Sequence, residues 1–117
     1  AVAALWRTVG AITGVLSSVY EHDMMHVVFA HEGDRTSSCS MTLRAPDAAD
    51  GFSTLVWGPS GRVELPVDDV DPRAAFTTAY EELAMMIRTG ERHHDCDARF
   101  GTRIVEVSAL AAAGLRT

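Results

Sequence analysis

Several features are missing from this sequence, and each absence excludes a class of protein. There is no G-x-G-x-x-G between a strand and a helix and no G-K-[ST], so no glycine-rich loop is present to cradle the phosphates of a dinucleotide. No apolar run approaches the length of a membrane-spanning helix, and no basic segment precedes an apolar run as in a secretory signal. We therefore expect no nucleotide-binding fold and no membrane association.

Cysteine and positive charge are both scarce. Cys39 and Cys96 lie far apart and outside any C-x-x-C spacing, so neither a disulfide framework nor a zinc knuckle is indicated, and we expect reduced thiols in a cytoplasmic protein. The net charge of −6 disfavours a phosphate backbone or an anionic membrane, because both are themselves negative. Nucleic acid is therefore not an expected partner.

The chain is of a size and composition suited to one globular domain. Its 117 residues, with 47% hydrophobic and 22% charged content, predict a single domain spanning residues 1–117 around one core. The sequence begins without methionine and inside what reads as a helix. We expect a fragment or a processed product of a longer protein.

The first half of the sequence is typical of antiparallel strands. Residues 1–9 are rich in helix formers and stop at Gly10, which predicts the tail of a helix. In the first predicted strand, near-alternation places Ile12 and Leu16 on one face and Val15 on the other. Strands are predicted, with turns between them, in the segments 12–20, 24–31, 38–44, 52–57 and 62–65.

The second half has helical periodicity. Asp71-Pro72 and Gly90 are start and stop signals for one helix, and Asp97 and Gly114 are those for another. Each helix carries one apolar stripe, and such stripes need a surface to cover them. The stripes consist of Phe76, Tyr80, Leu83 and Ile87, and of Phe100, Ile104, Val107 and Ala111. The sequence thus predicts an α+β fold, a mostly antiparallel β-sheet with two C-terminal helices packed on one face.

Two groups of histidines contain the residue types that bind zinc. On a strand, His26 and His31 point to opposite faces, and His22 lies about 13 Å from His26 at roughly 3.3 Å per residue. The segment 93–97 (HHDCD) lies between two helices, where polar residues are expected because loops are solvated. We interpret both groups as structural, with no metal site, and we interpret Glu81 and Glu82 as part of a solvated helix face.

Four segments, in this order, carry a resemblance to a known family. A helix, a glycine and a strand come first, then an aspartate before a strand–turn–strand hairpin, then a hairpin around G-x-x-G, and last a pair of helices. These segments are Leu5-Trp6-Arg7-Thr8-Val9-Gly10 with the strand from Ile12, Asp23 with Glu32-Gly33-Asp34, residues 56–65 (VWGPSGRVEL), and residues 76–90 with 97–114. Together they resemble the C-terminal domain of the Gfo/Idh/MocA family, the glucose-fructose oxidoreductases and inositol dehydrogenases.

The resemblance implies a division of labour between two domains. An N-terminal Rossmann domain of the parent chain is the implied partner and binds NAD or NADP, so this chain is expected to hold no cofactor. The implied reaction is hydride transfer to or from a sugar, inositol or related polyol. The implied catalytic lysine lies in the nucleotide-binding domain, and residues 1–9 carry neither the acidic residue nor the histidine that this helix has in relatives. No catalytic residue is therefore assigned.

What remains for this chain, by the same resemblance, is substrate binding and oligomerisation. Asp47 and Asp50 lie in the loop that approaches the substrate in relatives and are the candidate substrate-binding residues. A homo-oligomer through the sheet face is expected. The alternative is a stand-alone, non-enzymatic dimeric binding module that uses the face around Ser38, Ser40 and Thr42, and a third hypothesis is a metal-binding regulator that uses His93, His94 and Cys96.

Overall fold

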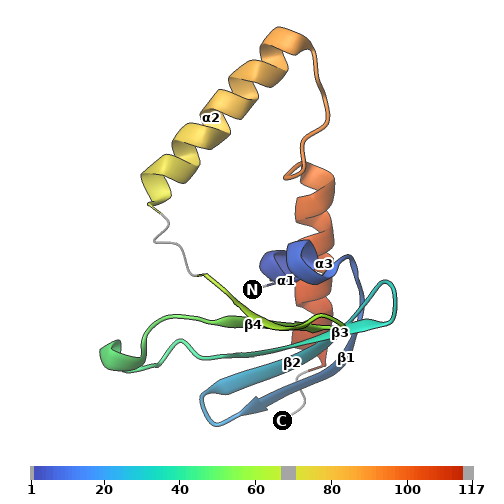
Figure 1. The fold of residues 1–117 in the computed structure, drawn as a ribbon, viewed down its shortest axis with the longest axis vertical. Helices are drawn as coiled ribbons and strands as arrows, with labels where there is room; N and C mark the ends of the chain where they lie inside the picture. The colour runs from blue at the N-terminus through green and yellow to red at the C-terminus, as the bar shows by residue number, and fades with distance from the viewer. Residues whose placement is uncertain (1, 67–70, 115–117) are drawn as a thin grey trace. The chain divides into compact units, whose positions relative to one another are not determined.

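The computed structural model describes residues 2–66 and 71–114, which belong to two compact units. One unit consists of residues 1–45 and 94–117, and the other of residues 46–93. The α+β class with antiparallel strands and C-terminal helices is confirmed (Figure 1). The elements are α1 (Val2–Val9), β1 (Ile12–Glu21), β2 (Met24–His31), β3 (Arg35–Met41), the 3₁₀ turn η1 (Asp47–Ala49), β4 (Thr54–Gly58), β5 (Gly61–Leu65), α2 (Pro72–Thr89) and α3 (Ala98–Ala113). The single domain over residues 1–117 stays a prediction.

The first unit is built on a three-stranded antiparallel sheet in the order β1-β2-β3. The turn between β1 and β2 contains His22, and the turn between β2 and β3 contains Gly33 and Asp34, all with positive φ. Glycine and short polar residues tolerate this conformation better than β-branched residues do. The strands predicted at 12–20 and 24–31 therefore form with nearly the predicted bounds.

Two irregularities in β1 change which side chains face the core. The pairing with β2 shifts register between Ile12 and Gly14 and again between Val15 and Ser17. As a result Ile12, Val15 and Ser18 lie opposite His31, Phe29 and Val27 and share their face of the sheet. The prediction that Leu16 shares a face with Ile12 and that Val15 lies opposite is wrong, and Leu16 is 63% exposed.

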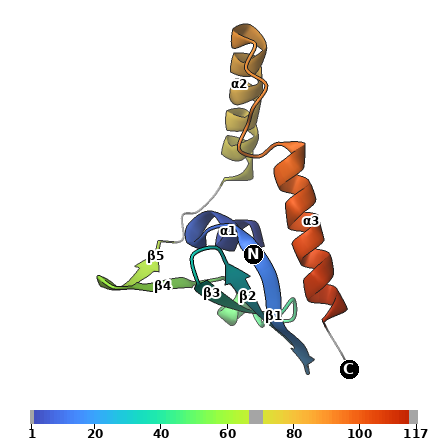
Figure 2. The ribbon, with the colours of Figure 1, turned by 90° about the vertical axis from the view of Figure 1, so that its right-hand side faces the viewer.

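The core of this unit lies between that face of the sheet and the two helices α1 and α3. Phe29 and Val27 of β2 are the most deeply buried side chains, at 1% exposure each. The core is completed by Ile12, by Val107 and Ala111 of α3, and by the partly buried Val2, Leu5 and Trp6 of α1. Figure 2 shows α3 running beside β1. Burial of this apolar surface is the main stabilising term of the unit.

The helices α1 and α3 also contact each other through aromatic side chains. The rings of Trp6 and Phe100 meet edge to face with their centroids 6.0 Å apart. The Arg7 guanidinium lies 4.1 Å from the centroid of the same Phe100 ring, in cation–π geometry. Phe100, on the first turn of α3, is thereby held between two side chains of α1.

Side-chain caps begin both long helices, as the sequence predicts. Asp97 Oδ1 accepts the backbone N–H of Phe100 at 2.9 Å, and Asp71 Oδ1 accepts that of Arg73 at 3.0 Å. Gly90 ends α2 in the left-handed region with φ 73°.

The two caps differ in what their helices bury, and this difference gives a testable prediction. Asp97→Ala should lower the free energy of unfolding of the first unit by about 1 kcal/mol, because α3 contributes to the core. The matched variant Asp71→Ala removes an equivalent cap from α2, a helix with no buried residue. It should leave the free energy of unfolding of the first unit unchanged. Urea denaturation followed by circular dichroism measures both. Equal losses in the two variants would contradict the assignment of the core to α3.

The second unit contains the hairpin β4–β5 and the helix α2. The strands pair from Thr54 with Leu65 to Gly58 with Gly61, and Pro59-Ser60 form the predicted tight turn. This hairpin is a sheet of its own, separate from β1-β2-β3. The sequence predicts a covered stripe on α2, but Phe76, Tyr80, Leu83 and Ile87 are 67%, 70%, 52% and 75% exposed.

Candidate functional site

The two candidate substrate-binding residues lie in one short turn of the second unit. Asp47 begins η1, and Asp50 follows its last residue and donates its backbone N–H to the Asp47 carbonyl at 3.3 Å. Both side chains are exposed, and no hydrogen bond or ion pair of either carboxylate is found in the described part of the chain. Two ionised carboxylates with free lone pairs can accept hydrogen bonds from hydroxyl groups of a ligand.

An aromatic ring that sequence reasoning missed follows this turn directly. Phe52 is 74% exposed and is joined to Asp50 through Gly51, whose φ is 135°. Only glycine adopts this conformation readily, so a side chain at this position would strain the link between the acidic residue and the ring. A sugar or cyclitol has an apolar C–H face and polar hydroxyl edges. The sequence predicts a strand that begins at Phe52, but β4 begins at Thr54, so the ring lies in the loop before the strand.

The face of the β1-β2-β3 sheet opposite the core, here called the second face, carries no carboxylate and no guanidinium in its two central rows. Residues that pair across the three strands form rows on this face. One row consists of Ser17, Val28 and Ser38, and the next consists of Val19, His26 and Ser40. His26 Nδ1 lies 2.8 Å from Ser40 Oγ. Ser38 and Ser40, which the sequence places on an open sheet face, lie here and are exposed. Thr42 lies one residue beyond β3.

His31, on the core face, is 4% exposed and connects three segments. Its Nδ1 lies 2.8 Å from the Gly10 carbonyl oxygen, and its Nε2 lies 2.7 Å from Ser37 Oγ. A carbonyl oxygen only accepts, so Nδ1 carries a proton and donates it. His31 therefore ties the residue that follows α1 to β2 and β3. Arg35 reinforces this connection by donating to the Val9 carbonyl at 3.0 Å.

The histidines of the front half do not converge. His22 lies in the β1–β2 turn, His26 on the second face and His31 in the core. Among the described residues, which include all of 93–97, no group of three or more His, Cys, Asp and Glu is placed to hold a metal ion. The structure thus gives no support to the metal-binding regulator.

Neither cysteine is arranged as a nucleophile with a base. Cys39 lies on β3, and its partial burial raises the pKa of the thiol. Cys96 is exposed and lies 3.8 Å from the Arg7 guanidinium, which also donates to the Asp95 carbonyl. His94 Nδ1 accepts the backbone N–H of Cys96 at 3.0 Å, so this nitrogen has no lone pair left to take a proton from the thiol.

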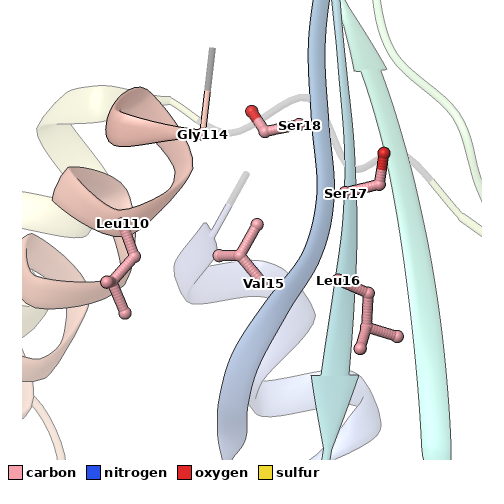
Figure 3. Close-up of a pocket in the computed structure, with 6 residues that line it drawn as sticks. All are labelled: Val15, Leu16, Ser17, Ser18, Leu110 and Gly114. Atoms are coloured by element: carbon pink, nitrogen blue, oxygen red, sulfur yellow. The ribbon is translucent and has the colours of Figure 1, made fainter. Parts of the chain in front are cut away.

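A shallow cleft of about 380 Å³ lies between β1 and the last turn of α3. Figure 3 shows Val15 and Ser18 pointing toward α3, and Leu16 and Ser17 pointing to the other side of β1. Ser18 Oγ donates to the Ala111 carbonyl at 2.7 Å, so this hydroxyl is already engaged. No charged side chain among the described residues lines the cleft, and it offers little to orient a ligand.

Comparisons of the chain with protein-family models, with curated proteins and with solved structures give no match. In the parts of the chain that the structure describes, no helix combines the length and the apolar content required to cross a membrane.

Proposed function

We propose that this chain is the substrate-binding and oligomerisation domain of an NAD(P)-dependent oxidoreductase that acts on a sugar, an inositol or a related polyol. The observation that carries the proposal is the loop from Asp47 to Phe52, which presents two unpaired carboxylates and an exposed ring within six residues. The carboxylates would accept hydrogen bonds from neighbouring hydroxyl groups, and the ring would cover the C–H face of the ligand.

The nucleotide is proposed to bind outside this chain. Anionic phosphates favour a helix N-terminus with free N–H groups, but α2 and α3 begin with the carboxylates of Asp71 and Asp97 in those positions. A phosphate there would meet a like charge. These two helix N-termini therefore do not fit the phosphates of a dinucleotide, and the proposed holder of NAD or NADP is the Rossmann domain of the parent chain. In this arrangement the chain orients the polyol and contributes no reacting group.

Oligomerisation is proposed to use the second face of the β1-β2-β3 sheet. The two rows centred on Val28 and His26 contain no carboxylate and no guanidinium. Two copies can therefore approach through these rows without repulsion between like charges. Antiparallel sheets stack face to face at about 10 Å when the facing side chains are of this size. The same surface serves the alternative function, a stand-alone dimeric binding module, which stays a second candidate.

Polyol binding is the part of the proposal that the chain alone can test. Titration of the ¹⁵N-labelled chain with myo-inositol should shift the amide signals of residues 47–52, with a dissociation constant of about 1–10 mM for such an open site. Asp47→Asn with Asp50→Asn should abolish these shifts, because an amide accepts fewer hydrogen bonds than a carboxylate and carries no charge.

A matched control is Asp34→Asn in the β2–β3 turn, where asparagine also tolerates the positive φ of Asp34. This variant should leave the binding curve unchanged. The absence of shifts with myo-inositol, glucose and sorbitol alike, or shifts that survive the double substitution, would refute substrate binding by this loop.

A further inference from the structure

The exposed stripe of α2 has a spacing that fits a second copy of the same helix. Phe76, Tyr80, Leu83 and Ile87 are separated by four, three and four residues, the alternation that keeps one seam facing a neighbouring helix. This pattern is symmetric about its own centre. When two copies run antiparallel about a twofold axis between residues 81 and 82, Phe76 lies opposite Ile87, and Tyr80 lies opposite Leu83.

The residues that flank the seam also suit close approach of two helices. Thr77, Ala79, Ala84 and Met86 are uncharged, and three of the four charged residues of the helix, Glu81, Glu82 and Arg88, lie at outward positions. Three of these flanking side chains, those of Thr77, Ala79 and Ala84, are small and allow a short distance between helix axes. No like charges therefore meet along the seam.

The ends of the seam carry opposite charges. In the same antiparallel register, Arg73 of one copy lies opposite Gly90 of the second copy, the residue before Glu91, and the twofold axis repeats this pair at the other end. Glu91 Oε1 accepts the backbone N–H groups of Arg92 at 2.9 Å and of His93 at 2.8 Å, which leaves Oε2 for a guanidinium. These two hydrogen bonds lower the pKa of the Glu91 carboxyl, so the group is charged at neutral pH.

We propose that α2 is a self-association surface, at which two copies of this chain form an antiparallel helix pair about a twofold axis. An aromatic side chain buries about 150–250 Å² when it is fully covered. The Phe76 and Tyr80 side chains are exposed by about two thirds, so the four rings of the two copies can bury roughly 400–700 Å² of surface. Leu83 and Ile87 bring the total toward the lower end of specific interfaces. Interfaces of this size are typically weak and transient, so we expect reversible association in the micromolar range.

This contact does not depend on the proposed redox role, and it is distinct from the second face of the sheet. Sedimentation equilibrium from about 5 to about 500 μM should show a reversible association of the full chain. Leu83→Glu should raise the dissociation constant of the α2 contact at least about tenfold, because it places a carboxylate in the apolar seam of each copy. Thr78→Glu adds the same charge on the outward side of α2 and should leave the constant unchanged.

A charge exchange tests the register. Arg73→Glu and Glu91→Arg should each weaken association, and the double variant should restore it, because the opposite charges then meet with their signs reversed. These positions are exposed, so far-ultraviolet circular dichroism should show unchanged helix content.

The outcomes separate this proposal from the sheet-face contact. Association that survives Leu83→Glu but disappears in Ser38→Arg, on the second face, would overturn the α2 contact and support the sheet face. Association lost in Leu83→Glu and kept in Ser38→Arg supports the α2 contact. A chain that stays monomeric at the highest concentration overturns self-association through α2 and leaves polyol binding at residues 47–52 untouched.

Discussion

Replacement of Phe29 by alanine is expected to destabilise the first unit by about 3–5 kcal/mol. The side chain is 1% exposed and lies at the centre of the core, between Val27 on its own strand and Val107 and Ala111 of α3. The loss combines the transfer of the ring from water with the cavity that it leaves. Because a domain of this size is stable by about 5–15 kcal/mol, Phe29→Ala should leave little margin at room temperature.

The matched control for this substitution is Leu16→Ala on the neighbouring strand. Leu16 is an apolar residue in the middle of β1, but it is 63% exposed, so its truncation should change the free energy of unfolding by no more than about 0.5 kcal/mol. Urea denaturation at constant m value gives both numbers. If Leu16→Ala were as destabilising as Phe29→Ala, the register shifts in β1 would be wrong and simple alternation would hold.

The second large effect is expected at His31. His31→Phe keeps a ring of similar size in the core, but it removes the partners of the Gly10 carbonyl and of the Ser37 hydroxyl. Each buried polar group left without a partner costs about 1–3 kcal/mol, so we expect a total loss of roughly 2–4 kcal/mol. The amide of Glu32, which donates to the Ala11 carbonyl at 3.0 Å, should also lose protection from hydrogen exchange.

Ser37→Ala separates the two contributions of His31. This variant keeps the hydrogen bond to the Gly10 carbonyl and should therefore cost only about 1 kcal/mol. A neutral or stabilising His31→Phe would show that the imidazole acts as a space-filling group and that the connection between α1 and the sheet rests on Arg35.

Local signals in the sequence were enough for the ends of the elements. Asp71, Asp97 and Gly90 act within one helical turn of their own position, so the residue type alone indicates the cap. Leu16 shows the limit of this reasoning. Its orientation depends on two shifts in the pairing with β2, and a periodic pattern read along one strand contains no information on its partner.

The α2 stripe and the acidic loop show a second limit. Helical spacing identifies Phe76 and Tyr80 as one apolar face, but it does not specify which surface covers that face. Asp47 and Asp50 were selected by resemblance, and the structure adds that both carboxylates are exposed and unpaired in the described part of the chain. The contribution of Phe52 was missed because the sequence pattern places this residue at the start of a strand over 52–57, whereas β4 begins at Thr54 and leaves the ring in the loop.

The contact between Trp6 and Phe100 has a consequence for how the chain acquires its structure during synthesis. Trp6 and Phe100 are separated by most of the sequence. The three strands therefore leave the ribosome well before α3 is available to cover Val27 and Phe29. Until residues 98–113 emerge, only α1 is available to cover the apolar face of the sheet. This interval is when chaperones, or premature pairing with a neighbouring nascent chain, have the greatest influence on the yield of folded protein.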